Sequence, residues 1–202
     1  MNGALAWILV ALGLGVLGVR RRSVAVALLT VQALVLAAVA LNDAASGGDV
    51  IAAAALVVRA LGIAALFLIL VSRTREPRPV RAATAPLIRA GIAVAFALAL
   101  TWLVPTMGLD SRTSERAALA LVAFGIATAA TRRATLFQVM AIVLVENGLA
   151  LAALGLPGTS ALIELGVTLD LTLVVLVAAV FHERIFAEFG AGDSAALRSL
   201  RD

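Results

Sequence analysis

The sequence predicts an all-α, polytopic membrane protein with seven transmembrane helices. Of its 202 residues, 63% are hydrophobic, and the mean hydropathy is +1.10. Its apolar segments approach or exceed the roughly 20 residues that cross a hydrocarbon core of about 30 Å. The segments are separated by short connections rich in glycine, proline and arginine, which leave no room for a soluble domain. We therefore expect a single membrane domain over residues 1–202.

Turn residues or arginines bound each apolar segment. The expected spans are Gly3–Val19, Val24–Leu41, Val50–Val71, Pro86–Met107, Arg116–Ala130, Thr135–Leu154 and Ser160–Phe181. The fifth span is the shortest, and Ser114 and Glu115 just before it suit a helix N-terminus. The first span has no basic region before it and no small-residue cleavage pattern after it, so we expect it to be retained rather than removed as a signal peptide.

The distribution of arginine predicts the orientation, because arginine-rich loops stay in the cytoplasm. Seven crossings with the N-terminus outside collect most arginines on one side: Arg20, Arg21, Arg22, Arg73, Arg75, Arg78, Arg81, Arg89, Arg132, Arg133, Arg184, Arg198 and Arg201. Only Arg112 and Arg116 lie on the other side. We expect the N-terminus outside, the C-terminus in the cytoplasm and a cytoplasmic tail over residues 185–202. Abundant alanine and arginine without lysine or tyrosine suggest a bacterial genome of high GC content, so the expected location is a bacterial cytoplasmic membrane.

A fixed offset of 111 residues relates charged positions in the two halves of the chain. It places Arg21-Arg22 on Arg132-Arg133, Arg59 on Asp170, and Arg73 on Arg184. This coincidence predicts two parallel three-helix units, residues 3–73 and 116–184, joined by a linker helix over residues 86–107. The expected architecture is therefore 3+1+3.

Three ionisable residues, Arg59, Glu146 and Asp170, interrupt apolar spans near their middle. A charge at this depth costs roughly 2.5–3.5 kcal/mol on insertion scales, so each residue is a functional candidate. Glu146 and Asp170 lie at similar depths in successive spans, where they could approach each other. A carboxyl group in that position can accept and release a proton. The competing interpretation is a static hydrogen-bonded acid that holds helices together.

Polar neighbours accompany these charges. Arg59 stays charged and cannot carry protons, so we expect it to act on a carboxylate electrostatically or to form a structural ion pair. Gln32 and Asn147 could extend a hydrated path or hydrogen-bond between helices, and Gly148 permits close helix approach.

Other polar residues have simpler expected roles. Thr168 and Thr172 most simply bond to their own backbone, and Glu164 reaches the outer surface. His182 is expected at the cytoplasmic interface.

Composition also bounds the chemistry of the chain. It has no cysteine and a single histidine, so it cannot by itself hold a thiolate metal site, an iron–sulfur cluster or a bis-histidine haem. We expect no cofactor and no metal. The formal charge of +4 arises from arginines in loops rather than on a soluble basic face, so nucleic acid is not an expected partner.

The segments Arg132-Arg133-Ala-Thr-Leu-Phe, Val145-Glu146-Asn147-Gly148 and Thr168-Leu169-Asp170-Leu-Thr resemble the E component of hydrogenase-4. The last three spans are also similar to the K subunit of respiratory complex I and to the C-type subunit of multisubunit cation/proton antiporters. In the K subunit, two intramembrane glutamates belong to a proton-conducting axis. Asp170 falls at the second of these positions, whereas Val143 occupies the first and the acid appears three residues later, at Glu146. Gln32 and Arg59 also look family-like.

The resemblance implies a non-redox membrane subunit of a complex-I-like oxidoreductase of the group 4 hydrogenase type. Its partners would be large antiporter-like membrane subunits and other subunits of that assembly. Two alternatives remain open at this point. One is a stand-alone 3+1+3 small-molecule transporter, although the first and fifth spans lack the proline typical of the SWEET sugar carriers. The other is a purely structural anchor subunit.

Overall fold

The computed structural model describes residues 3–43, 47–73, 85–109, 111–156 and 161–190, and the side chains of residues 43, 47, 48, 161–171 and 189 lie outside this description. The regular structure of these ranges consists of seven helices. They are α1 (Gly3–Gly18), α2 (Arg22–Asp43), α3 (Gly47–Arg73), α4 (Pro86–Leu103), α5 (Arg112–Thr131), α6 (Thr135–Leu154) and α7 (Ala161–Phe189). The all-α prediction is confirmed.

Within the described ranges, four helices, α2, α3, α4 and α6, are long and apolar enough to cross a membrane, and α1 is apolar but shorter. Large apolar side chains also face outward, including Trp102 at 89% exposure and Leu87 at 86% on α4. Exposing these apolar side chains to water is unfavourable, whereas contact with lipid acyl chains is favourable. The structure is therefore that of an α-helical membrane protein.

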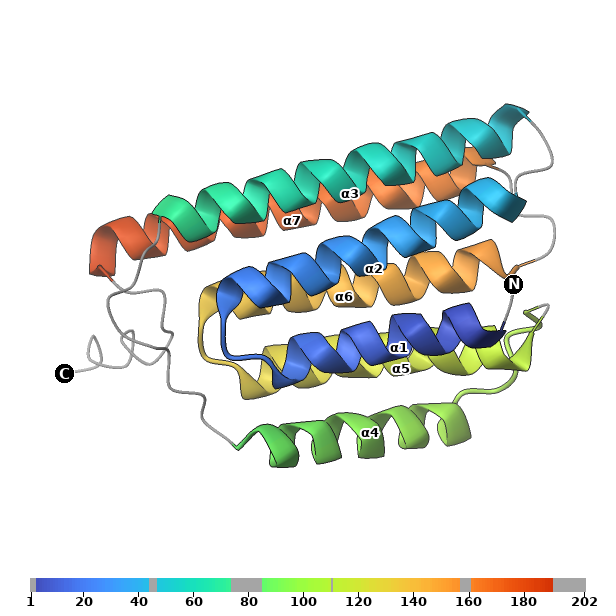
Figure 1. Cartoon of the computed structure of the whole chain (residues 1–202), viewed down its shortest axis with the longest axis horizontal. Helices are drawn as coiled ribbons and strands as arrows, with labels where there is room; N and C mark the ends of the chain where they lie inside the picture. Colours follow the sequence, from blue (N-terminus) through green and yellow to red (C-terminus); the bar gives the residue numbers. More distant parts are fainter. Residues whose placement is uncertain (1–2, 44–46, 74–84, 110, 157–160, 191–202) are drawn as a thin grey trace.

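The helices form two layers with α4 beside them (Figure 1). One layer contains α1, α2 and α3, and the other contains α5, α6 and α7. Between the layers, α1 packs on α5, α2 on α6, and α3 on α7, while α4 packs on α5 and α1. Consecutive helices run in opposite directions, so the α1–α2, α3–α4 and α5–α6 connections lie at one end of the bundle (Figure 1).

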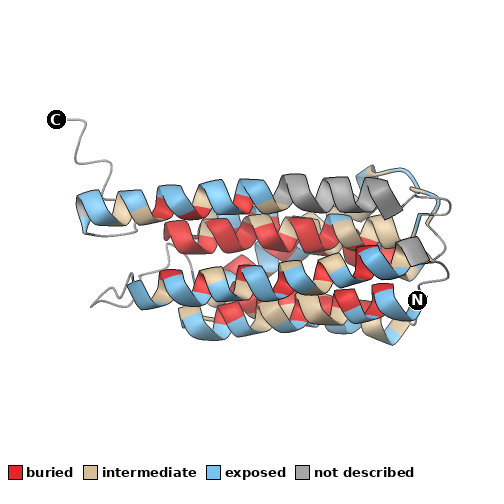
Figure 2. Ribbon diagram, turned by 90° about the horizontal axis from the view of Figure 1, so that it is seen from above, coloured by how far each residue is buried: buried red, intermediate tan, exposed pale blue. Residues whose placement is uncertain are grey.

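Helix α6 forms the centre of the core. In its most apolar window, 61% of the residues are buried, compared with 17% for α4 at the edge. Its fully buried side chains include Leu136, Met140 and Leu144, which recur every fourth residue on one face of the helix. Figure 2 shows the same contrast between buried inner helices and exposed outer faces. A polar group on α6 is therefore shielded on most sides by protein.

Glycines bring α5 and α6 into close contact. A Cβ atom added at Gly125 would lie 2.5 Å from the Cγ2 atom of Val145, and one added at Gly148 would lie 2.9 Å from the carbonyl oxygen of Ala118. No real Cβ fits at such distances, so the backbones approach because the side chains are absent. The packing role considered for Gly148 is what this geometry supports.

The predicted end of the linker helix was wrong. Helix α4 ends at Leu103 rather than at Met107. Pro105 explains the difference, because its ring fixes φ and removes a backbone donor, and the residue before it disfavours the helical region. The segment stays largely apolar beyond Leu103, so hydropathy alone did not show where the helix ends.

The predicted start of the fifth helix was also wrong. Helix α5 begins at Arg112 instead of Arg116, because the side chain of Ser111 caps it by accepting a 3.2 Å hydrogen bond from the Thr113 amide. Ser114 and Glu115 lie inside the first turn and are buried. The Glu115 Oε1 atom accepts from the backbone amide of Met107 at 3.2 Å, which ties the α4–α5 connection to α5.

The seventh helix also continues beyond its expected end at Phe181 as far as Phe189. The first residues of the predicted tail, 185–189, are therefore helical. Residues 191–202 lie outside the described part of the chain.

Candidate functional site

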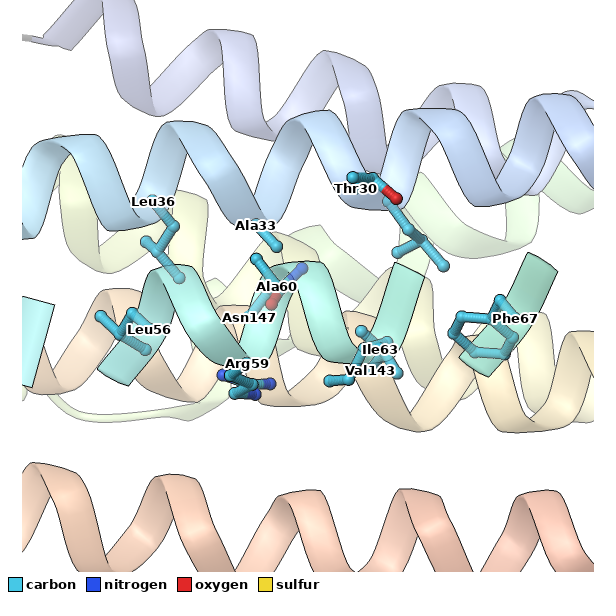
Figure 3. A pocket seen from close by; sticks show the side chains of 11 residues that line it. Thr30, Ala33, Leu36, Leu56, Arg59, Ala60, Ile63, Phe67, Val143 and Asn147 are labelled. Atoms are coloured by element: carbon cyan, nitrogen blue, oxygen red, sulfur yellow. The ribbon is translucent and has the colours of Figure 1, made fainter. Parts of the chain in front are cut away.

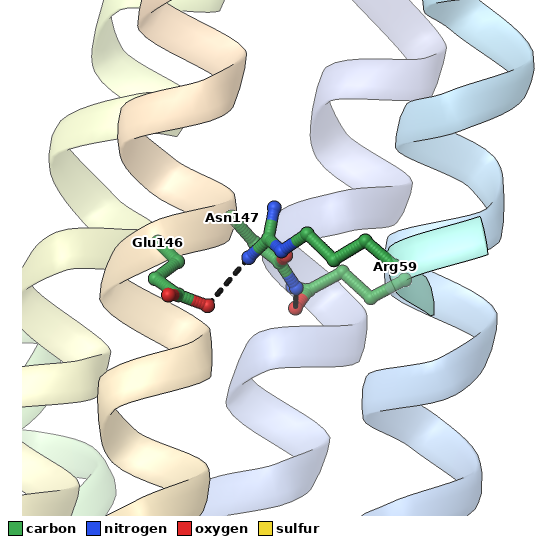
Figure 4. Close-up of polar contacts among 4 residues, drawn as sticks. Arg59, Glu146 and Asn147 are labelled. Atoms are coloured by element: carbon green, nitrogen blue, oxygen red, sulfur yellow. Dashed lines mark hydrogen bonds and ion pairs between the residues drawn. The ribbon is translucent and has the colours of Figure 1, made fainter. Parts of the chain in front are cut away.

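A buried ion pair joins the two layers near the middle of the bundle. The Nη2 atom of Arg59 on α3 donates to the Oε2 atom of Glu146 on α6 at 2.5 Å (Figure 4). The two side chains are 7% and 0% exposed. The apolar surroundings of α3 and α6 offer little solvation, so each charge stabilises the other. The acidic partner expected for Arg59 is therefore Glu146.

A second polar chain reaches the same place from the opposite side. The Nδ2 atom of Asn147 donates to the Oε1 atom of Gln32 at 2.9 Å, and the Nε2 atom of Gln32 donates to the carbonyl oxygen of Leu9 at 2.8 Å. Both side chains are fully or almost fully buried. Since Asn147 follows Glu146 directly, polar contacts extend from α1 through α2 to α6 and onward to α3. We call Gln32, Arg59, Glu146 and Asn147 the polar cluster.

The polar cluster is incompletely hydrogen-bonded. The Glu146 Oε1, Asn147 Oδ1 and Arg59 Nε atoms are buried and have no hydrogen-bond partner within the described structure. Leaving a buried polar atom unpaired costs about 1–3 kcal/mol. A water molecule could accept from Arg59 Nε or donate to one of the two oxygens, and a proton could bind at Glu146 Oε1. The cluster thus has capacity for exchangeable groups in addition to its fixed bonds.

Arg59 lies between two spaces. A cavity of about 10 Å³ between α2, α3 and α6 is bordered by Arg59, Asn147 and Thr30 (Figure 3), and this volume holds about one water molecule. A much larger apolar groove of about 650 Å³ runs between α3 and α7, with Leu66 and Val175 among its lining residues and Arg59 at its wall. The guanidinium group therefore separates a small internal cavity from a groove at the outer surface.

Asp170, the second predicted acid, lies in α7, which packs against α6. Its side chain is outside the described part of the structure, as are those of Glu164 and Thr168. The expected approach of Asp170 to Glu146 therefore stays a prediction. Thr172 lies on the wall of the groove between α3 and α7.

His182 differs from its expected interfacial position. It is 1% exposed, and its Nδ1 atom makes a short hydrogen bond with the hydroxyl group of Thr135 at the start of α6. The contact links the C-terminal part of α7 to the start of α6. Helix α7 extends one to two turns beyond His182, which explains why the residue is enclosed rather than terminal.

Two buried arginines were not among the predicted site residues. Arg89, which served only to predict the orientation, lies in the first turn of α4 and is 0% exposed. Arg132 is 4% exposed and donates from Nη2 to the carbonyl oxygens of Leu17, at 3.1 Å, and Val19. The available signal for Arg89 was its position three residues after Pro86, inside the apolar segment rather than before it.

The site can hold charge and a proton but has no features of a metal centre. Among the described residues, no group of three or more histidine, cysteine, aspartate or glutamate side chains is placed to bind a metal ion. What the polar cluster offers is one ionisable carboxyl group, one fixed cation and two amides inside an apolar bundle. No protein-family model, curated protein or solved structure matches the chain.

Proposed function

We propose that this chain is a non-redox membrane subunit of a complex-I-like oxidoreductase of the group 4 hydrogenase type, in which Glu146 relays protons near the middle of the membrane. The observation that carries the proposal is the buried pair of Glu146 with Arg59, which leaves the second carboxylate oxygen unbonded in the described structure. That oxygen is a position at which the carboxylate can take up a proton, which weakens its pair with Arg59, and the amides of Gln32 and Asn147 continue the polar path toward α1.

The proposal includes seven membrane crossings arranged as 3+1+3. Helix α5 has 20 residues, which corresponds to about 30 Å, and α7 has 29 residues, so both are long enough to cross. The pairwise packing of α1 on α5, α2 on α6 and α3 on α7 supports two equivalent units, with α4 outside them. The arginines at the α1–α2 and α5–α6 connections support a cytoplasmic location for that end and an outside N-terminus.

The partners in this proposal are large antiporter-like membrane subunits of the same assembly in a bacterial cytoplasmic membrane. The groove between α3 and α7, with Arg59 at its wall, gives a partner helix access to the polar cluster. Protons would then pass between Glu146 and acids of the neighbouring subunit, with Asp170 as a further relay on α7.

Replacing Glu146 with glutamine in the intact complex tests the relay. We expect electron transfer to persist in membrane vesicles while the protons moved per electron fall severalfold, because the amide cannot titrate. Asp170→Asn should have a similar effect. Glu183→Gln is the matched control, because Glu183 is 47% exposed and pairs with Arg73 at the surface. Unchanged proton movement in both the Glu146 and Asp170 variants would refute the relay.

The anchor function is a second candidate, because the same ion pair joins α3 to α6 across the two layers. In that case the pair holds the subunit in shape and moves no protons. The double variant Arg59→Met with Glu146→Leu separates the two functions. An anchor keeps both assembly and proton coupling after this apolar replacement, whereas a relay keeps assembly and loses coupling.

A further inference from the structure

Three arginines gather at the end of the bundle where α1 and α5 finish and α4 begins. Arg20 lies in the α1–α2 connection, Arg89 in the first turn of α4, and Arg132 in the α5–α6 connection. The positive charges of Arg20 and Arg89 repel each other, and both repel the charge of Arg132. Burial, followed by the positive charges of Arg89 and Arg20, lowers the pKa of Arg132 to about 10. We call these three residues the arginine cluster.

Two members of the cluster are enclosed and short of partners. Arg89 is 0% exposed, and none of its three guanidinium nitrogens has a hydrogen-bond partner in the part of the chain that the structure describes. Arg132 uses Nη2 on the carbonyl oxygens of Leu17 and Val19 and stacks over Phe137, with 4.1 Å between Cζ and the ring centre. Its Nε atom has no partner among the same residues. A guanidinium group keeps its charge at physiological pH, so burial without an anion is unfavourable. Among the described residues, no carboxylate pairs with Arg89 or Arg132.

The helix ends nearby also favour an anion. Neither α4 nor α6 has a side-chain cap, since their N-caps are Ala85 and Ala134. The first-turn amides of both helices add positive potential at the same end of the bundle, and phosphate groups bind to such amides readily. The forked guanidinium group also matches the oxygens of a phosphate. These features favour a phosphate over a smaller or neutral ligand.

The surroundings of Arg89 indicate where the phosphate comes from. Leu87 and Ile88, which precede Arg89 on α4, are 86% and 56% exposed, and the apolar outer surface continues along the helix to Trp102. A phosphate at Arg89 would therefore be followed by surface suited to acyl chains. We propose that the arginine cluster binds the phosphate of an anionic phospholipid at the cytoplasmic boundary of the membrane.

Binding requires the Arg89 side chain to turn outward, because the guanidinium group is enclosed. That movement breaks no hydrogen bond to the described residues, since the side-chain nitrogens of Arg89 make none with them. The inference does not depend on proton transfer at Glu146. It concerns the N-terminal end of α6 rather than its middle and would hold equally for a structural subunit.

The test measures lipid binding to the purified full chain in a neutral detergent. Phosphatidylglycerol, phosphatidylcholine with the same acyl chains, and inorganic phosphate are added separately, while bound lipid is counted by native mass spectrometry and the unfolding temperature is recorded. We expect phosphatidylglycerol to bind and to raise the unfolding temperature. Phosphatidylcholine and inorganic phosphate should have little effect. This comparison uses the unaltered chain and needs no variant to fold.

Arg89→Gln then locates the site. Loss of a charge-assisted contact of about 1.5–3 kcal/mol predicts roughly 10- to 100-fold weaker phosphatidylglycerol binding, and Arg89→Lys should lose less. Arg21→Gln and Arg116→Gln are controls, because both residues are exposed and lie at the same and the opposite end of the bundle, respectively. Equal binding of the two lipids, an equal effect of inorganic phosphate, or unchanged binding by Arg89→Gln would overturn the proposal.

Discussion

Replacing Arg59 with methionine should strongly destabilise the bundle. Methionine keeps the length and the apolar part of the side chain but leaves the Glu146 carboxylate, which is 0% exposed, without its cation. Removing one member of a buried ion pair costs about 3–5 kcal/mol. Native proteins are stable by about 5–15 kcal/mol, so this change removes a large share of the free energy of unfolding.

The free energy of unfolding can be measured by titrating the purified chain with sodium dodecyl sulfate in mixed micelles and following helicity by circular dichroism. Arg73→Met on the same helix is the matched control. Its pair with Glu183 has a 2.8 Å contact, but the two side chains are 64% and 47% exposed. An exposed pair contributes about 0–1 kcal/mol, so the control should unfold nearly like the unaltered chain.

The double variant Arg59→Met with Glu146→Leu completes the cycle. With both charges removed, the buried space becomes apolar, and such replacements are often neutral or stabilising. We expect the double variant to regain most of the stability that Arg59→Met loses. Two results would show that the buried pair does not hold α3 to α6. One is a free energy of unfolding for Arg59→Met within about 1 kcal/mol of that of the unaltered chain. The other is a double variant that is less stable than Arg59→Met.

Three further changes test the packing and the hydrogen bonds by the same unfolding measurement. Gly148→Val should lower the free energy of unfolding by at least about 1–3 kcal/mol, because its Cβ would lie 2.9 Å from the α5 backbone. The control Gly62→Ala, where an added Cβ would have no atom within 4 Å, should be neutral or slightly stabilising. Equal effects of the two changes would contradict the close approach of α5 and α6. Asn147→Leu should lower the free energy of unfolding by about 1–3 kcal/mol, because Gln32 loses its 2.9 Å hydrogen bond. An unchanged midpoint of the unfolding titration would show that this hydrogen bond does not stabilise the bundle. Ser111→Ala should lower the free energy of unfolding by about 0.5–2 kcal/mol, because α5 loses its N-cap. An unchanged free energy of unfolding would indicate that α5 does not begin after Ser111.

The sequence predicted the helices best where apolar character and helix geometry coincide. Helix α6 has the expected bounds of Thr135 and Leu154, and α4 begins at Pro86 as expected. The errors occurred where hydropathy and backbone chemistry diverge. Leu103 ends α4 because of Pro105, although the segment stays apolar beyond it, and Ser111 starts α5 although charged residues follow. A cap or a proline decides such boundaries more strongly than mean hydropathy.

The candidate residues could be chosen from sequence because charge in an apolar segment is rare, but their pairing could not. The contact of Arg59 with Glu146 joins residues 87 positions apart, and that of Gln32 with Asn147 joins residues 115 apart. Their meeting depends on how the two layers stack, which helical periodicity alone does not specify. The burial of Arg89 was missed for a related reason, since the charge rule predicts a side of the membrane and says nothing about burial by neighbouring helices.

The two sides of α6 differ in mechanical freedom. On the side facing α5, Gly125 and Gly148 allow close contact with the neighbouring backbone, so the α5–α6 hairpin is tightly packed. On the side facing α3, the contact is made by the long, flexible side chain of Arg59, which lies beside an open groove. Loss of the Glu146 charge would remove the ion pair that joins α3 to α6, while the close contact between α5 and α6 would stay. Of these two contacts of α6, only the one with α3 depends on the charge of a single carboxyl group.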